Sequence, residues 1–335
     1  MESKISTNFL KNHYDFITEG KSNGVMVGLN QKPIKEVKYN SDGDFVFGCG
    51  LDSIITMLNC EGKVKGTFQK SGGAVNSILP LDFTLFSASS DTTLSSWDIE
   101  SGKLLNTKET ESMVKAIDGN ESVIYFLTDN SLNLQGYIGR IDLRTYKIEK
   151  LLEPKVVSTK GFLKEDFFIF GNEQGEISKL DFRNNNVITA KHHDAKITCV
   201  SPSACRNFFA TSSLDATMKL IDSETLQFKR LFKAEEPVNC ASIFPSNDIL
   251  LSGGGINARD VTVTKGKSTF DTNFYDIAIS QKIGYFNTHI GPVNCSSISP
   301  TGLQIATGGE DGRIALVNLG NDFYKAPFTD LSKYI

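Results

Sequence analysis

The sequence has few of the residues that build catalytic and metal-binding centres. It contains four histidines, and no two of its six cysteines form a C-x-x-C pair. No group of acidic residues or cysteines accompanies His192 and His193 as further metal ligands. Nucleophilic and acid–base catalysis also need such groups close together. We therefore expect no catalytic residue, no metal site and no cofactor.

The sequence also lacks an excess of positive charge and any long apolar run. Its 35 lysines and arginines are outnumbered by 39 aspartates and glutamates, which gives a net charge of -4. An acidic surface does not attract the phosphates of nucleic acids or anionic membranes, so direct binding to either is not expected. Charged residues interrupt the first twenty positions, and no stretch approaches the roughly eighteen apolar residues of a membrane span. We expect a cytoplasmic protein.

What the sequence does contain is a repeated all-β unit. Between Gly73 and Asn106, four short β-rich runs are separated by turns rich in Pro, Asp, Ser and Gly. Four strands in roughly 40 residues correspond to one blade of a β-propeller. The same pattern returns at 197–232, at 293–319 and near the start of the chain, and looser copies fill 111–153, 161–191 and 237–288. We predict seven blades over residues 25–322, with an N-terminal extension at 1–24 and a C-terminal tail at 323–335.

Two regular spacings support this repeat. The dipeptide Trp97-Asp98 is echoed by Ile141-Asp142, Leu180-Asp181 and Ile221-Asp222, at intervals of 44, 39 and 41 residues. In four units an aspartate stands six residues before the position equivalent to Trp97, and three of these aspartates have Asn30, His193 or His289 a further 22 residues upstream. A period near 40 residues is typical of four-stranded blades.

These features resemble the WD-repeat family, in which the histidine of a Gly-His pair hydrogen-bonds the turn aspartate of the same blade. The resemblance implies structural side chains, here termed the blade locks. Such a charge-assisted buried bond contributes about 1.5–3 kcal/mol. A catalytic His–Asp dyad is the alternative, but no nucleophile accompanies the pair and it recurs in different blades. The blade-lock residues are Asn30, Asp52, Asp91, Trp97, His193, Asp215, His289 and Asp311.

Two further expectations concern the ends and the outline of the ring. The run VMVGL, from Val25 to Leu29, precedes the first full unit, while the last unit offers three obvious strands. We predict that the early run supplies the missing strand, because a linear chain must otherwise leave an unpaired edge. Around Lys265-Gly266 we expect two elongated strands in a projecting hairpin.

The second half of the sequence resembles one WD-repeat family more specifically. The segments GGGINARDVTVT, GKSTFDTNFY and HIGPVNCSSISPTGLQIATGGEDG are similar to those of the i subunit of eukaryotic translation initiation factor 3. The similarity extends over about residues 24–324, although Asn30 replaces the histidine of the first blade and the N-terminus is about twenty residues longer. It implies a scaffold that binds an α-helical segment of the b subunit, lies near the g subunit, and supports recruitment of the small ribosomal subunit and scanning.

By position, the helix-binding surface implied by this resemblance falls on the fifth and sixth blades. Acidic residues there would pair with basic residues of the partner, and the candidates are Asp215, Asp222, Glu235 and Glu236. The alternative is that Asp215 holds its own turn and the others are solvated charges.

Two other functions remain open from the sequence. Another interaction propeller, such as a ribosome-bound kinase receptor or a receptor-associated WD protein, would share the same repeat. An enzyme using the central channel would need convergent His, Asp and Glu at the channel mouth, and the scarcity of histidine argues against it.

Overall fold

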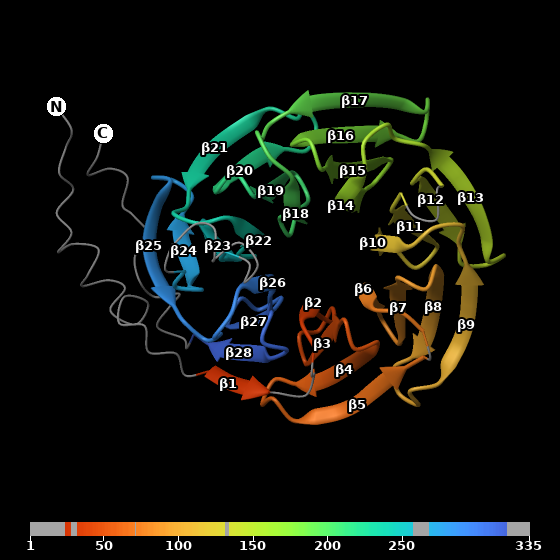
Figure 1. Cartoon of the computed structure of the whole chain (residues 1–335), viewed down its shortest axis with the longest axis horizontal. Coiled ribbons are helices and arrows are strands. Elements are labelled where there is room, and N and C mark those ends of the chain that lie inside the picture. The colour runs from red at the N-terminus through yellow and green to blue at the C-terminus, as the bar shows by residue number, and fades with distance from the viewer. Residues whose placement is uncertain (1–23, 28–31, 71, 131–133, 257–267, 320–335) are drawn as a thin grey trace.

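The computed structural model describes residues 24–27, 32–70, 72–130, 134–256 and 268–319, and within these ranges all regular structure is β-strand. The strands form seven four-stranded antiparallel sheets, which surround a central axis as the blades of a propeller (Figure 1). The predicted all-β, seven-bladed architecture is confirmed. The blades follow one another around the ring in chain order.

Within blades 1–6 the four strands also run in chain order, from the innermost to the outermost. Blade 1 contains β2 (Ile34–Tyr39), β3 (Phe45–Gly50), β4 (Ile54–Asn59) and β5 (Val64–Gln69). Blade 2 contains β6 (Val75–Leu81), β7 (Thr84–Ser89), β8 (Thr93–Asp98) and β9 (Leu104–Glu109). Blade 3 contains β10 (Val114–Gly119), β11 (Val123–Thr128), β12 (Ile138–Asp142) and β13 (Lys147–Leu152). Blade 4 contains β14 (Ser158–Lys164), β15 (Phe167–Asn172), β16 (Glu176–Asp181) and β17 (Asn186–Lys191). Blade 5 contains β18 (Ile197–Pro202), β19 (Phe208–Ser213), β20 (Thr217–Asp222) and β21 (Phe228–Lys233). Blade 6 contains β22 (Val238–Ile243), β23 (Ile249–Gly254), β24 (Thr272–Asp276) and β25 (Gln281–Phe286).

Blade 7 combines strands from both ends of the described chain. Its inner strands are β26 (Val293–Ile298), β27 (Gln304–Gly309) and β28 (Ile314–Asn318). The fourth strand, β1 (Gly24–Val27), runs antiparallel to β28, with Gly24 opposite Val317 and Val27 opposite Ile314 (Figure 1). Residues 1–23 of the predicted extension and all of the predicted tail lie outside the described residues.

The hairpin predicted around Lys265-Gly266 also lies outside the described residues, which stop at Ile256 and resume at Ser268. Its flanking strands can be compared with the prediction. β23 has six residues and β24 has five, and strands of these lengths also occur in the other blades. Neither flanking strand is elongated within the described residues, and the hairpin itself stays a prediction.

The hydrophobic core lies between the blades. Seven apolar clusters each join two neighbouring blades, because the strands of a blade present one face to each neighbour. The abundant phenylalanine of the sequence fills these spaces, since a large ring can span the distance between two twisted sheets. The largest fully buried side chains include Phe47, Phe68, Phe126, Phe162, Phe168, Phe209, Phe232 and Phe274.

A second link between blades arises from an irregularity at the start of each innermost strand. The strand register shifts there in all seven blades, as in a β-bulge. At four junctions the side chain in the bulge donates a hydrogen bond to the next blade, where the acceptor is the backbone carbonyl of the first residue of the innermost strand. We term this bond the inter-blade staple. The staples are Asn76 to Val114 (2.8 Å), Thr198 to Val238 (2.6 Å), Asn239 to Val293 (3.1 Å) and Asn294 to Ile34 (3.0 Å).

At the other three junctions the residue in the bulge is not a staple, and charged side chains bridge the blades. Glu36 of blade 1 accepts hydrogen bonds from the Ser77 hydroxyl (2.6 Å) and the Ile78 amide (2.7 Å) of blade 2. Asp118 of blade 3 accepts from the Leu163 amide of blade 4 (2.8 Å). Blades 4 and 5 are joined by lysines and a glutamate, described below.

The carboxylate of Glu36 also connects blades that are not neighbours. Lys160 Nζ of blade 4 lies 2.7 Å from Glu36 Oε1, so this ion pair crosses the central channel. Burial raises the pKa of Glu36, but Lys160 and Lys38 outweigh burial and lower it to about 2. Glu36 is therefore an anion at neutral pH.

Candidate protein-binding site

Two of the predicted blade-lock residues, His193 and Asp215, meet in blade 5. His193 Nδ1 lies 3.0 Å from Asp215 Oδ2, and His193 Nε2 lies 2.8 Å from the hydroxyl of Thr211. Asp215 also accepts hydrogen bonds from the Thr217 amide (2.9 Å) and hydroxyl (2.6 Å). Burial lowers the pKa of His193 below 6.5, so the imidazole is neutral at pH 7. The histidine is 1% exposed and has no access to a substrate.

Blade 7 repeats this arrangement. His289 Nδ1 lies 3.1 Å from Asp311 Oδ1, and His289 Nε2 lies 2.9 Å from the Thr307 hydroxyl. Gly309 is required at this point, because a Cβ there would lie 2.5 Å from His289 Nδ1. A buried network at equivalent places in two blades belongs to the blade rather than to a reaction centre.

Blade 2 contains the same turn without a histidine. Asp91 accepts hydrogen bonds from the Thr93 amide (3.1 Å) and hydroxyl (2.5 Å), and Lys70 Nζ lies 3.8 Å from its carboxylate. Trp97 Nε1 donates a 2.9 Å hydrogen bond to Ser87, which occupies the place of Thr211 in blade 5. Lys70 is therefore the side chain that pairs with the turn aspartate in blade 2, as histidine does in blades 5 and 7.

Blade 1 shows the least of this pattern. Asp52 accepts a long hydrogen bond from the Ile54 amide, 3.4 Å, within its own turn. Asn30, the predicted partner of Asp52, lies outside the described residues. Sequence spacing alone therefore supports the Asn30–Asp52 pair.

The four predicted partner-binding residues do not share one face of the ring. Asp215 precedes β20 and Asp222 ends it, so the six residues of that strand, roughly 20 Å, separate them. Glu235 and Glu236 follow β21, whose last residue Lys233 pairs with Thr217, and they lie at the Asp215 end. We call this end of every blade the lock face, and the end with Asp222 the opposite face. The structure thus separates Asp222 from the other three candidates.

Asp222 organises the turn between β20 and β21. Its carboxylate accepts hydrogen bonds from the Glu224 amide (3.0 Å) and the Thr225 amide (2.9 Å). These bonds, with that of Thr225 first, hold the pKa of Asp222 below 3.8. Asp222 is therefore occupied within its own turn.

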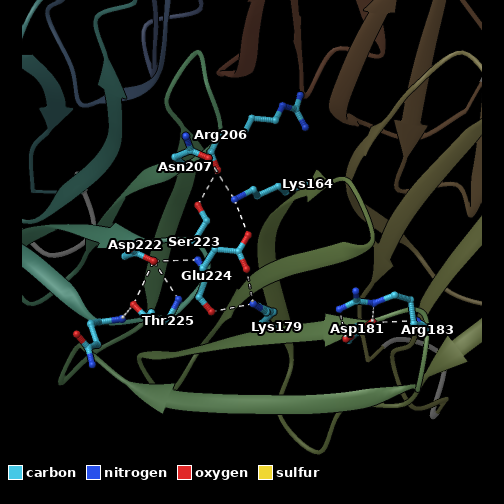
Figure 2. A network of polar contacts seen from close by, with 11 residues as sticks. Lys164, Lys179, Asp181, Arg183, Arg206, Asn207, Asp222, Ser223, Glu224 and Thr225 are labelled. Atoms are coloured by element: carbon cyan, nitrogen blue, oxygen red, sulfur yellow. Dashed lines mark hydrogen bonds and ion pairs between the residues drawn. The ribbon is translucent and has the colours of Figure 1, made fainter.

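That turn presents Glu224, which no sequence pattern had indicated, to two buried lysines of blade 4 (Figure 2). Glu224 Oε1 lies 2.8 Å from Lys164 Nζ, and Glu224 Oε2 lies 3.4 Å from Lys179 Nζ. Lys179 also donates to the Glu224 carbonyl (2.8 Å) and lies 4.0 Å above the ring of Phe167. This cluster replaces the inter-blade staple at the junction of blades 4 and 5.

Glu235 and Glu236 border a pocket of about 150 Å³ on the lock face of blade 6. Glu236 is committed to the chain itself, because it accepts a hydrogen bond from the Thr269 amide (3.2 Å) and another from the Ser268 hydroxyl. Glu235 is exposed and has no hydrogen bond or ion pair to the described part of the chain. Leu214, beside Asp215, is 41% exposed, and sequence patterning gave no sign of it. Glu235 and Leu214 are therefore exposed on the lock face of blades 5 and 6, where they can contact a partner.

The central channel does not gather catalytic groups. It encloses about 430 Å³ and is lined by the innermost strands of all seven blades. Burial raises the pKa of the Cys199, Cys240 and Cys295 thiols along it, so these thiols remain protonated at neutral pH. Across the described ranges, no three His, Cys, Asp or Glu side chains come together as metal ligands. No helix long and apolar enough to cross a membrane occurs there either.

Comparison with known proteins gives the family. The model of the WD domain, G-beta repeat, matches residues 184–222 and 280–318. Over 309 residues the chain is 31% identical to eukaryotic translation initiation factor 3 subunit I of Xenopus tropicalis, a match that covers 87% of this chain and 95% of the relative. The human subunit I is 29% identical over 321 residues, covering 91% and 98%, and that of Saccharomyces cerevisiae is 30% identical over 319 residues, covering 88% and 92%. The chain belongs to the WD-repeat family of eukaryotic translation initiation factor 3 subunit I, a family of non-catalytic scaffold proteins.

Proposed function

We propose that this chain is a scaffold subunit of eukaryotic translation initiation factor 3 in the cytoplasm, where it binds the b and g subunits. Through them it supports small-ribosomal-subunit recruitment and scanning, without touching RNA itself. The observation that carries the proposal is similarity to subunit I over nearly the full length of both chains. The acidic net charge supports the indirect role, because it gives no general attraction to RNA.

The proposed b-subunit surface is the lock face of blades 5 and 6. Glu235 offers an exposed carboxylate and Leu214 an exposed apolar side chain. An amphipathic helix that presents one basic and one apolar residue would satisfy both. Asp215 and Glu236 contribute by shaping this surface, since their carboxylates are already bonded within the chain. Asp222 is not part of the proposed surface.

Charge reversal tests this surface. We expect Glu235→Lys in the full chain to lower the affinity for the C-terminal segment of the b subunit roughly tenfold without lowering the Tm. Glu109→Lys is the matched control, because Glu109 is also exposed at the lock-face end of an outer strand, in blade 2. Equal affinities for the two variants, measured by titration calorimetry, would contradict the proposed surface.

The alternative function, in which the chain is a scaffold of another complex, needs a separate test. Mass spectrometry of proteins that co-purify with the tagged native chain should recover initiation factor 3 subunits in near-stoichiometric amounts. Recovery of a kinase or receptor complex in their place would favour the alternative function.

A further inference from the structure

The turn between β6 and β7 in blade 2 exposes a phenylalanine on the opposite face of the ring. Phe83 is 80% exposed, the largest value among the large apolar residues of the described chain. Its neighbour Asp82 has φ +46°, in the left-handed region, and the pair forms the two-residue connection between the strands. Leaving a phenylalanine in water forgoes the stabilisation that its burial would give.

The fold does not need a phenylalanine at this position, as blade 4 demonstrates. There the connection between β14 and β15 is Glu165-Asp166, and Glu165 has φ +47°. The carbonyl of Asp166 accepts a 2.9 Å hydrogen bond from the Phe182 amide, as that of Phe83 accepts one of 2.9 Å from Ile99. The two turns share their geometry, and blade 4 has a carboxylate where blade 2 has a ring.

Further apolar side chains lie in the turns and strand ends of this face in blades 2 and 3. Ile99, bonded to Phe83 through the backbone, is partly buried against the cluster between blades 1 and 2. Leu81, Leu143 and Tyr146 are partly buried against the cluster between blades 2 and 3. Phe83 thus shares this face with side chains that border the clusters on both sides of blade 2. The five residues Leu81, Phe83, Ile99, Leu143 and Tyr146 are called the Phe83 surface.

The charge around the Phe83 surface is negative. The turns on this face of blades 1–3 contain eight carboxylates and four basic side chains. These turns are residues 40–44, 59–63, 82–83, 98–103, 120–122 and 142–147. The corresponding turns of the other blades also carry more carboxylates than basic residues. Such a face repels nucleic-acid phosphates and anionic lipid and attracts a basic polypeptide.

We propose that the Phe83 surface binds a basic segment of a partner protein, which packs a large apolar side chain against Phe83 while its lysines or arginines face the surrounding carboxylates. The surface lies on the opposite face from the proposed b-subunit contacts, so one scaffold holds two partners at once. This site does not depend on the proposed b-subunit surface, because no residue is shared.

The occupant can be identified by photo-crosslinking in the full chain. We replace Phe83 with the photoreactive p-benzoylphenylalanine, irradiate cells that express this chain, and sequence the crosslinked peptide by mass spectrometry. The same replacement at Ile188, 55% exposed on the outer strand of blade 4, is the control. A peptide with net positive charge and a large apolar residue supports the proposal. An acidic peptide, RNA, a second copy of this acidic chain, or no crosslink above the Ile188 control overturns it.

Two substitutions then test the energetics with the crosslinked segment as the probe. Phe83→Asp, which reproduces the turn of blade 4, should weaken binding about tenfold or more and leave the Tm within about 2 °C. Glu100→Lys should weaken it about threefold, with an effect that disappears at high salt. Ile188→Asp should leave it unchanged. Retained affinity of Phe83→Asp overturns the proposal, whereas an unchanged affinity of Glu235→Lys for the b subunit overturns only the function proposed for the other face.

Discussion

Among the described residues, Glu224 is the one carboxylate that forms ion pairs with two buried ammonium groups at the junction of blades 4 and 5. The side chains of Lys164 and Lys179 are 7% and 8% exposed, whereas that of Glu224 is 55% exposed. The Glu224→Ala substitution therefore removes an accessible group and leaves two inaccessible charges. Lys164 keeps a 3.3 Å bond to Asn207, and Lys179 keeps the carbonyl of residue 224 and the Phe167 ring.

The expected cost follows from that asymmetry. Removing one partner of a fully buried ion pair costs about 3–5 kcal/mol. Solvent screening at the exposed glutamate and the remaining partners of the lysines reduce this, so we expect about 1–3 kcal/mol. For a chain of this length that corresponds to a Tm lower by roughly 2–6 °C. The hydrogen bond from Lys164 holds the pKa of Glu224 below 4.5, so its contribution is present above that pH and is lost as the pH falls through the lowered value.

Differential scanning fluorimetry at pH 7 measures the effect, and Glu100→Ala is its matched control. Glu100 occupies the equivalent position in blade 2, two residues after Asp98, and is exposed without a charged partner among the described residues. We expect no change in Tm for this control. Equal Tm values for the two variants would show that Glu224 does not stabilise the junction.

Three further predictions concern the network of polar side chains. His193→Gln should flatten the fall of Tm between pH 7 and pH 5. The lowered pKa of His193 makes the native state bind the proton less readily than the unfolded chain, so the native protein loses stability as the pH drops below 6.5. Parallel profiles of Tm against pH for the two proteins would contradict this. Glu36→Gln should cost about 3 kcal/mol in urea unfolding at pH 7, and the difference from the unsubstituted chain should shrink as the pH falls from 4.5 toward 2. Trp97→Phe should cost about 1–2 kcal/mol, because the buried Ser87 hydroxyl loses its donor, and adding Ser87→Ala should recover part of that loss in the same assay.

The sequence predicts the blades better than the contacts between them. Turn residues and the period near 40 place the strands, and the fixed spacing of 22 residues pairs His193 with Asp215 because both lie in one repeat. The ion pair of Glu36 and Lys160 joins residues 124 positions apart, and its partners meet only once the ring has closed. No local pattern records such a contact. Glu224 was missed for the same reason, since its lysines belong to the preceding blade.

The separation of Asp215 from Asp222 was, in contrast, available from the sequence. The two aspartates precede and follow one predicted strand, and opposite ends of a strand lie on opposite faces of a propeller. The prediction placed the two aspartates on one surface only because both belong to blade 5, since the resemblance implied a region of the chain. Strand direction therefore decides which residues of a blade can share a partner.

The chemistry of the junctions also decides which variants report on binding. The junction of blades 5 and 6 is held by a neutral staple from Thr198, so a lysine at Glu235 changes no charge that holds those blades together. At the junction of blades 4 and 5 the turn shaped by Asp222 carries Glu224, and replacing Asp222 would displace the carboxylate from Lys164 and Lys179. Loss of a partner after substitution of Asp222 would then reflect a loosened ring as readily as a lost contact. Substitution of Glu235 avoids this ambiguity, because within the described residues its side chain has no bonded partner and the junction of blades 5 and 6 has no ion pair.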